Sequence, residues 1–248
     1  LTDNFMAAPT GEVKRVADTL LKRIMGGAYP AGLRLPAEAA LAEELACGRS
    51  TIREALRYLA GLGLVESRRG SGAMVLDYRR EGAPALLPTY VTLGRLEMPA
   101  GRFAREMLGM RTLMACEAVR LAASYATPEG LAPARRFLDA APALEGDSAA
   151  HATNELEMYR ELVVASGMWP AAWMVNAFWA PLRELNVMFA PALGSVQPDF
   201  QESMKTMFAH IEAGDAQAAV SHVRAWFEKV DAPLVKVVEQ ALGGNDGN

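Results

Sequence analysis

The chain has 248 residues, of which 51% are hydrophobic and 22% are charged, and its formal net charge is −4. This composition supplies a core for one or two domains, and the acidic balance argues against a general nucleic-acid coat protein. No apolar run approaches the ~20 residues of a membrane span, and the N-terminus lacks a signal-peptide pattern, so we expect no membrane partner. Cys47 and Cys116 are the only cysteines, and a reduced pair in a cytoplasmic protein is the plain interpretation.

The N-terminal part contains three segments with helical periodicity. Apolar residues recur at the spacing of one helix face over Val13–Ile24, and the following Gly26-Gly27 is typical of a helix end. A second short helix begins at Pro36, and a tight turn at Cys47-Gly48 separates it from a third. The buried stripe expected for the third helix is Ile52, Ala55, Leu56 and Leu59.

The third helix carries arginines on a second stripe. Arg49, Arg53 and Arg57 are four residues apart, and arginine binds both guanine edges and phosphate. Ser50 or Thr51 can cap the helix and contact phosphate oxygens. Taken alone, three arginines at this spacing more often form the ordinary solvent-exposed face of a helix. The alternative of a DNA-reading helix gains weight from the segments on either side of them.

The segment after the third helix has the pattern of a wing. Leu64–Glu66 and Ala73–Leu76 predict two short strands, joined by Arg68-Arg69 and by glycines at the tip, including Gly70. Two helices, a turn, an arginine helix and a wing in this order predict a winged helix-turn-helix over residues 11–78, and hence a DNA-binding protein. Residues 1–79 hold 11 Lys and Arg against 9 Asp and Glu. So weakly basic a domain should need a dimer on two half-sites.

The remainder of the chain predicts an all-helical domain. Residues 79–101 are broken by glycine and proline, which indicates a linker with one short helical turn. From residue 102 to 242 every strong segment has helical periodicity, so the fold class is mainly α with a C-terminal helical bundle. The six expected helices lie near 102–126, 128–143, 148–166, 170–191, 198–213 and 215–241.

The N-terminal segment resembles the DNA-binding domain of GntR-family bacterial transcription regulators. The matching stretches are Ala31–Glu38, Arg49–Leu56 and Gly63–Val65. The family often has an arginine where this chain has Ala39, so one operator contact is absent or replaced. The resemblance, with Arg57 added from the stripe, implies DNA contacts from Arg34, Arg49, Ser50, Thr51, Arg53, Arg57, Arg69 and Gly70.

The bundle resembles the FCD ligand-sensing domain of the FadR subfamily. The matching stretches are Arg111–Ala118, Tyr159–Gly167 and Ile211–Ala216. This resemblance implies that a small acid or related metabolite binds inside the bundle and shifts the two DNA-binding domains of a homodimer on a pseudo-palindromic operator. It also implies a regulator, usually a repressor, in the bacterial cytoplasm.

The metal ligands of many FCD domains, an Asp and three His, are not retained. A carboxylate at Glu155 could still ligate a metal, but a phenol, a thioether and an indole could not complete the site. His222 lies one turn before Trp226 and is better explained as an ordinary core histidine. We therefore expect no metal and no cofactor. The aligned positions are Glu155, Tyr159, Met204 and Trp226.

Without a metal, the expected ligand anchor is an arginine. Arg111 lies on an apolar stripe of the first bundle helix and needs a partner, either Glu155 or a ligand carboxylate. Aromatic and methionine side chains, including Met207, would form an adaptable apolar wall around it, although each of them alone is as well explained as core. The expected effector-binding residues are Arg111, Glu155, Tyr159, Trp179, Met204 and Trp226.

Two other classes of function stay open. The bundle could be a dimerisation module that senses no ligand. An enzyme is the less supported class, because the sequence has no Ser-His-Asp order, phosphate loop, metal cluster or dinucleotide fingerprint. A ligand-responsive DNA-binding regulator remains the leading hypothesis.

Overall fold

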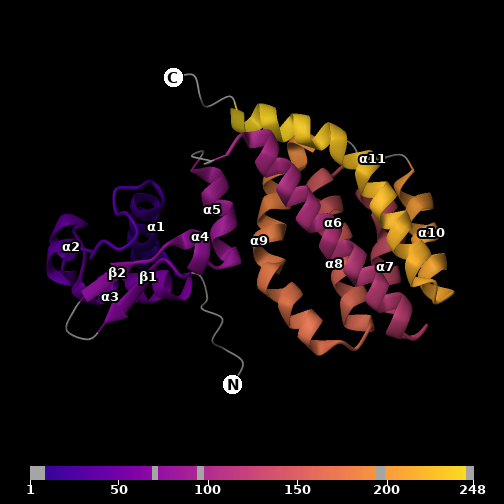
Figure 1. The fold of residues 1–248 in the computed structure, drawn as a ribbon, viewed down its shortest axis with the longest axis horizontal. Coiled ribbons are helices and arrows are strands. Elements are labelled where there is room, and N and C mark those ends of the chain that lie inside the picture. The colour runs from indigo at the N-terminus through magenta and orange to yellow at the C-terminus, as the bar shows by residue number, and fades with distance from the viewer. Residues whose placement is uncertain (1–8, 69–71, 94–97, 194–198, 244–248) are drawn as a thin grey trace. The chain divides into compact units, whose positions relative to one another are not determined.

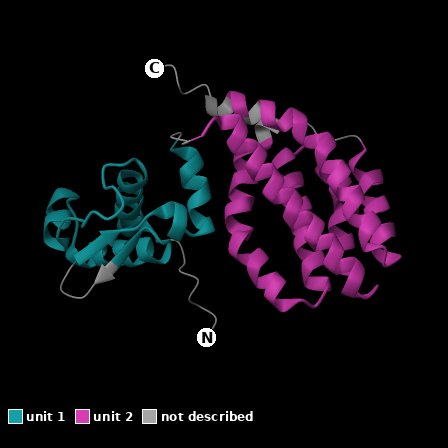
Figure 2. Ribbon diagram, in the orientation of Figure 1, with its two compact units in different colours: residues 1–95 teal, residues 96–248 magenta. Residues whose placement is uncertain are grey.

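The computed structural model describes residues 9–68, 72–93, 98–193 and 199–243 (Figure 1). The chain divides into two compact units, residues 1–95 and 96–248, which are coloured separately in Figure 2. Each unit has its own hydrophobic core. Among the residues described, no helix is both long and apolar enough to cross a membrane.

The first unit has the elements of a winged helix-turn-helix. Helix α1 packs against α3, and Leu20, Ile52 and Leu59 are fully buried between the helices. Strands β1 and β2 pair antiparallel, with Val65 opposite Val75. The expected helices and wing are therefore present. The bounds are α1 Gly11–Met25, α2 Glu38–Glu44, α3 Arg49–Gly61, β1 Val65–Arg68 and β2 Gly72–Val75.

The turn between α2 and α3 differs in detail from the expectation. Its left-handed residue is Ala46, with φ of 50°, rather than a glycine. Gly48 instead serves as the extended N-cap residue of α3, and no side chain caps this helix. Ser50 and Thr51 lie inside the first turn of α3, so the expectation that one of them caps the helix is wrong.

The segment after the wing is more ordered than a linker. It forms α4 (Tyr78–Glu81), a 3₁₀ turn (Pro84–Leu86) and α5 (Leu87–Thr92). Leu86 is buried in the first unit's core, and the backbone N–H of Ala83 donates to the carbonyl oxygen of Leu62 at 3.0 Å. The sequence predicted a linker over residues 79–101 with one short helical turn, and residues 79–92 contain more helix than that. The prolines here begin helical turns, where the missing N–H costs nothing.

The second unit is the predicted all-helical bundle. Helices α6 and α11 run side by side, and α8 packs against both α7 and α9 (Figure 1). The expected helix over 128–143 starts later, at Ala132, and ends in a 3₁₀ turn. The bounds are α6 Ala100–Tyr125, α7 Ala132–Ala140, a 3₁₀ turn Ala141–Leu144, α8 Ser148–Ala165, α9 Trp169–Leu193, α10 Phe200–Glu212 and α11 Ala216–Gly243.

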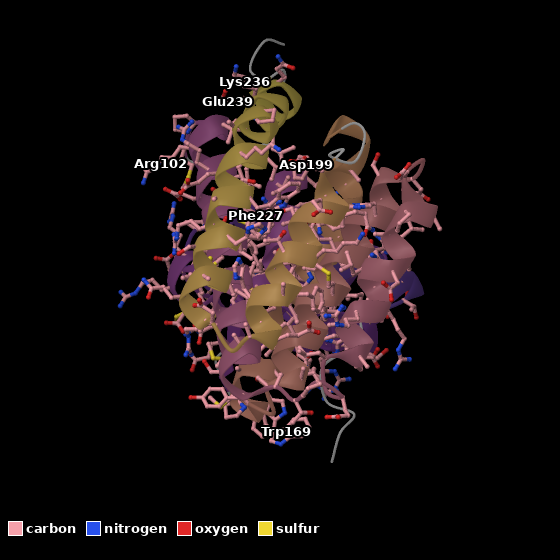
Figure 3. The ribbon with its side chains drawn as sticks, turned by 90° about the vertical axis from the view of Figure 1, so that its right-hand side faces the viewer. Arg102, Trp169, Asp199, Phe227, Lys236 and Glu239 are labelled. Carbon is pink, nitrogen blue, oxygen red and sulfur yellow. The ribbon has the colours of Figure 1, made fainter. Side chains whose placement is uncertain are left out.

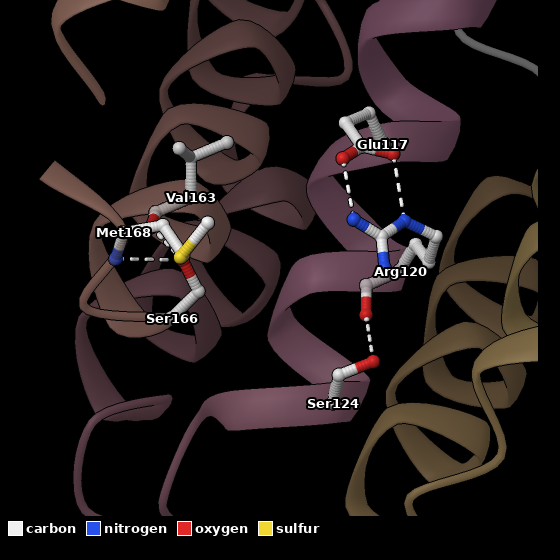
Figure 4. A network of polar contacts seen from close by, with 6 residues as sticks. All are labelled: Glu117, Arg120, Ser124, Val163, Ser166 and Met168. Atoms are coloured by element: carbon white, nitrogen blue, oxygen red, sulfur yellow. Dashed lines mark hydrogen bonds and ion pairs between the residues drawn. The ribbon is translucent and has the colours of Figure 1, made fainter. Parts of the chain in front are cut away.

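Local polar contacts set the ends of these helices. The Asp147 side chain accepts from the backbone N–H of Ala150 at 2.9 Å and caps α8. At the other end of α8, the Ser166 hydroxyl donates to the Val163 carbonyl at 2.6 Å and accepts from the Met168 N–H at 3.3 Å (Figure 4). Gly167, with φ of 71°, then turns the chain into α9.

Candidate functional site

The outer face of α3 presents arginine to solvent. Arg49, Arg53 and Arg57 are exposed, on the side away from the buried stripe that holds α3 against α1. Arg49 and Arg57 make no ion pair with any residue that the structure describes. Arg53 lies 3.6 Å from a carboxylate oxygen of Glu38, but both side chains are about half exposed, and such pairs contribute little. These guanidinium groups are therefore available to an external partner.

The neighbouring hydroxyls differ in their availability. Ser50 is exposed in the first turn of α3. Thr51 is half-buried, and its hydroxyl donates to a carboxylate oxygen of Glu12 at 3.3 Å, which ties α3 to the start of α1. Only Ser50 of the two is free to turn toward phosphate without breaking an internal contact.

Arg34 is brought to the wing by backbone pairing. Residues 33–35 add to the edge of β2, because the N–H of Leu35 donates to the Ala73 carbonyl at 2.8 Å and Val75 donates to Leu33 at 2.9 Å. Arg34 itself forms a bridge with Met74 and its side chain is exposed. No periodicity in the sequence indicated this third strand-like segment. The expected contacts Arg69 and Gly70 lie outside the described residues.

In the bundle, Arg111 has an internal partner that the sequence did not reveal. Its guanidinium forms an ion pair with Asp231 of α11, and its central carbon lies 4.2 Å from the centre of the Phe227 ring. Figure 3 shows Phe227 within the bundle. The expected protein partner was Glu155, which makes no hydrogen bond or ion pair with Arg111. Asp231 is 120 positions away from Arg111 in the chain. The only sign of this partner in the sequence is that an acidic residue stands between Val230 and Ala232 in a short apolar stretch.

Glu155 keeps a buried oxygen without a hydrogen bond. This atom is its Oε1, and the Nε of Arg111 is likewise buried and unpartnered. Burial raises the pKa of Glu155, the positive charge of Arg111 opposes that rise, and the negative charge of Asp231 adds to it. Burial also raises the pKa of Asp231, against the effect of Arg111. The charge of Arg111 thus acts on two carboxyl groups, of which only Asp231 is paired with it.

Two hollows adjoin this ion pair. An inner cavity of about 40 Å³ lies between α6, α8 and α9, and its walls include Arg111, Tyr159 and Trp179. A larger groove of about 430 Å³ lies between α6 and α11, and Asp231 is part of its lining. The inner cavity holds little more than one water molecule, whereas the groove has the size of a small-ligand site. The Arg111–Asp231 pair lies at the boundary of the two.

The remaining expected effector residues form core contacts. Met204 is fully buried, and its sulfur lies 3.9 Å from the hydroxyl of Tyr159. Trp226 packs edge-on against Phe200, with ring centres 6.1 Å apart. Burial raises the pKa of Tyr159 well above its usual value, so it stays a neutral phenol. Three of the six expected residues therefore line one cavity, and Met204 and Trp226 fill the space beside it.

These side chains do not fit the metal of related FCD domains. A thioether that accepts a hydrogen bond from a phenol, and an indole packed edge-on against phenylalanine, offer no ligand set for a divalent ion. The Nε2 atom of His222 lies 3.0 Å from the hydroxyl of Ser203 and 2.8 Å from its carbonyl oxygen, so it is already engaged. Within the described ranges, no group of three or more His, Cys, Asp or Glu is placed to hold a metal ion.

Comparisons with known sequences address both units. Residues 12–75 match the model of the bacterial regulatory proteins of the gntR family, and residues 106–229 match the FCD domain. The HTH-type transcriptional regulator Mce2R of Mycobacterium tuberculosis is 32% identical over 171 residues, which are 67% of this chain and 68% of that protein. The galactonate operon transcriptional repressor of Escherichia coli is 36% identical over 154 residues, 61% of this chain and 65% of the repressor.

A solved structure supports the fold. The Lar protein, which controls the expression of the Listeria monocytogenes agr system, matches 93% of this chain and 99% of its own with a TM-score of 0.60 at 16% identity. At that identity the likeness shows the fold alone. The sequence relatives and the two domain matches identify a transcription regulator rather than an enzyme. The chain therefore belongs to the GntR family of bacterial DNA-binding transcription regulators and carries a C-terminal FCD domain.

Proposed function

We propose that this regulator is a homodimeric repressor that leaves a pseudo-palindromic operator when a small organic acid binds its FCD domain. The observation that carries the DNA-binding role is the exposed arginine face of α3, on a different side of the helix from the buried stripe. An exposed helix of this kind enters the major groove, where arginine binds guanine O6 and N7 through two hydrogen bonds. Such a protein acts where the chromosome is, in the cytoplasm.

The proposed DNA contacts divide into two kinds. Arg49, Arg53 and Arg57 would read base edges or pair with phosphate from α3, and Ser50 would donate to a phosphate oxygen. Arg34 would reach the DNA phosphate backbone from the edge of the wing, because residues 33–35 are hydrogen-bonded to β2. Thr51, Arg69 and Gly70 remain contacts proposed from the family resemblance. Phosphate contacts fix the orientation, and base contacts supply the specificity.

The proposed effector is an organic acid that competes with Asp231 for Arg111. A carboxylate entering from the groove between α6 and α11 would pair with the guanidinium, and the displaced Asp231 would turn toward solvent. The inner cavity would then open to the groove and accept an apolar tail along Trp179. Tyr159 and the unpartnered oxygen of Glu155 would supply polar contacts, with Met204 and Trp226 as the wall behind them.

The direction of regulation is proposed by analogy. One relative is named as a repressor, of the galactonate operon, and another as the Glc operon transcriptional activator. The repressor match is the more identical of the two and covers more of this chain, 61% against 45%. We therefore propose repression with release by ligand.

Selection of bound DNA from a random pool tests the DNA-binding part. The expected result is a paired half-site with centres about one helical turn, or a multiple of it, apart. Arg49→Ala should abolish enrichment, whereas Arg136→Ala, at an exposed arginine on α7, should not. Enrichment that survives Arg49→Ala, or recovery of unpaired single sites, would contradict the proposal.

A second candidate, a bundle that only dimerises, is favoured by the small size of the inner cavity. Thermal unfolding against a panel of carboxylic acids separates the two. A true effector at a hundredfold above its dissociation constant adds roughly 2.7 kcal/mol of stability. Asp231→Asn should strengthen that response by removing the competing carboxylate, whereas Glu228→Gln in the same groove should not. A panel without response for all three proteins would leave dimerisation as the bundle's role.

A further inference from the structure

Exposed apolar side chains gather at one place on the bundle. Of the described residues, eleven large hydrophobic ones are exposed, and seven of these lie on α9 or on the end of α8 and the turn that precede it. Trp169 and Trp173 are 62% and 69% exposed, and Trp169 stands at the end of the bundle in Figure 3. Single exposed apolar residues are ordinary, but such a cluster marks an interaction surface. The seven are Val164, Met168, Trp169, Trp173, Met174, Val187 and Met188.

The opposite side of the same helix is already occupied. Val175, Trp179 and Leu182 line the inner cavity, and α9 packs along α8. Helix α9 is thus apolar on both its inner and its outer side. A helix that is apolar all round is typical of a buried position. We call the seven residues above the α9 outer face, and we expect another molecule or segment to bury it.

We propose that the α9 outer face is the docking surface for a second copy of this chain. A tryptophan side chain carries up to about 250 Å², so Trp169 and Trp173 together leave roughly 300 Å² exposed. Met174, Val187 and Met188, spread along a helix about 36 Å long, and Val164 and Met168 just before it extend this toward the ~800 Å² that each partner contributes to a standard interface. Exposed tryptophans are also the residues that most often dominate binding energy.

The order of large and small residues along the face fits a twofold pairing. Trp173 and Met174 stand about 21 Å from Val187 and Met188, and the exposed Ala180 lies midway between the two groups. Two antiparallel copies of α9 would meet closely at Ala180. The tryptophan end of one copy would then cover the valine–methionine end of the other, as an isologous interface requires.

Charge also favours a second copy as the occupant. Arg183 and Glu184 are the only charged residues of α9, and they are adjacent, exposed and of opposite sign. Two such faces meet without net repulsion. Nucleic acid is a poor occupant for this face, because binding a polyanion requires an excess of cations.

This inference rests on the proposed function, because the α9 outer face would form the contact of the proposed dimer. The same helix also adjoins the proposed effector site. The inner side of α9 lines the cavity and its outer side would carry the dimer contact. A ligand that enlarges a cavity of about 40 Å³ must displace a wall, and α9 is one of its three walls. Displacement of α9 would shift one copy relative to the other, and with it the two DNA-binding domains.

Sedimentation equilibrium of the full chain, without DNA or ligand, tests the docking surface. The unmodified protein should have twice the 26.7 kDa mass of one chain at micromolar concentration. Trp173→Glu and Ala180→Arg should each weaken the dimer at least about tenfold. Both positions are exposed, so the helical content measured by circular dichroism should not change. Leu113→Glu, at a 61% exposed residue of α6, is the matched control and should leave the dimer intact.

Each other outcome overturns the assignment. A monomeric unmodified protein would mean that something other than a second copy covers α9. Dimers that survive both α9 substitutions would place the interface elsewhere, and so would loss of the dimer in the Leu113→Glu control. Because the measurement contains no operator and no acid, a failure of the proposed effector response leaves its result unaffected.

Discussion

The two domains use arginine in opposite ways. On α3, Arg49 and Arg57 are exposed and unpaired among the described residues, whereas the Arg111 side chain is only 26% exposed and is held by Asp231. An exposed guanidinium keeps its hydration and can exchange it for phosphate or a base edge. A buried one requires an anion within the fold. Removing the first kind should therefore affect binding alone, and removing the second kind should affect the fold.

The largest expected effect on stability is that of Arg111→Ala. It leaves Asp231 and Glu155 in the interior without a cation, so we expect a loss of about 2–4 kcal/mol, reduced from the range of fully buried pairs because the pair is partly exposed. Urea unfolding at pH 7 measures it. Arg57→Ala, the matched change on α3, should stay within about 0.5 kcal/mol of the unmodified protein.

Replacing both partners of the pair sharpens this test. Arg111→Met combined with Asp231→Leu removes two opposite charges and keeps the volume, so most of the stability should return. If the double variant were as unstable as Arg111→Ala, packing of the arginine stem against Phe227, rather than charge compensation, would explain the loss.

The largest expected effect on binding is that of Arg49→Ala. Loss of a bidentate contact to guanine costs about 1–3 kcal/mol per half-site, or roughly 5- to 150-fold in affinity. Fluorescence anisotropy with a selected operator at fixed salt measures it, and thermal unfolding should be unchanged. An unaltered affinity would remove Arg49 from the interface, and a uniform loss on all sequences would make it a phosphate contact.

The pH dependence of stability probes Glu155. Burial raises its pKa in the folded state above the usual value near 4.5, so the folded protein holds this proton more tightly than the unfolded chain. The stability that this preference gives is fully present below the unfolded pKa and is lost as pH rises through the folded pKa. Glu155→Gln should remove this decline, so the variant should be the more stable of the two at pH 7 and gain nothing at pH 4. A variant less stable at pH 7 would show that the ionised carboxylate supports Arg111.

The sequence predicted the first unit in more detail than the second. Local signals define a winged helix-turn-helix: the stripe through Ile52, the turn near Gly48 and the glycines of the wing all act within a few residues. The features missed there were non-local. The pairing of Leu35 with Ala73 and the docking of Leu86 on the core depend on contacts between distant residues, which periodicity does not encode.

In the bundle, the helices could be predicted but their mutual rotation could not. Periodicity placed Arg111 on an apolar stripe and so identified a buried charge. It could not choose among acids on other helices, since Glu155 and Asp231 lie on α8 and α11 and only the packing angles decide which one reaches the guanidinium. The exposed face of α9 was missed for a related reason. A helix that is apolar throughout does not indicate which side the monomer buries.

The smallest expected effect concerns the turn that presents α3. Ala46 has a left-handed backbone, with φ of 50°, which costs a residue with a Cβ about 1–2 kcal/mol and costs glycine almost nothing. The greater freedom of glycine in the unfolded chain offsets part of the gain, so Ala46→Gly should stabilise the domain by roughly 0.5–1 kcal/mol. Ala60→Gly, inside α3, is the matched control and should destabilise by a similar amount. If Ala46→Gly also weakened the fold in urea, the left-handed turn between α2 and α3 would be absent in solution, and the outward placement of the α3 arginines would lose its structural basis.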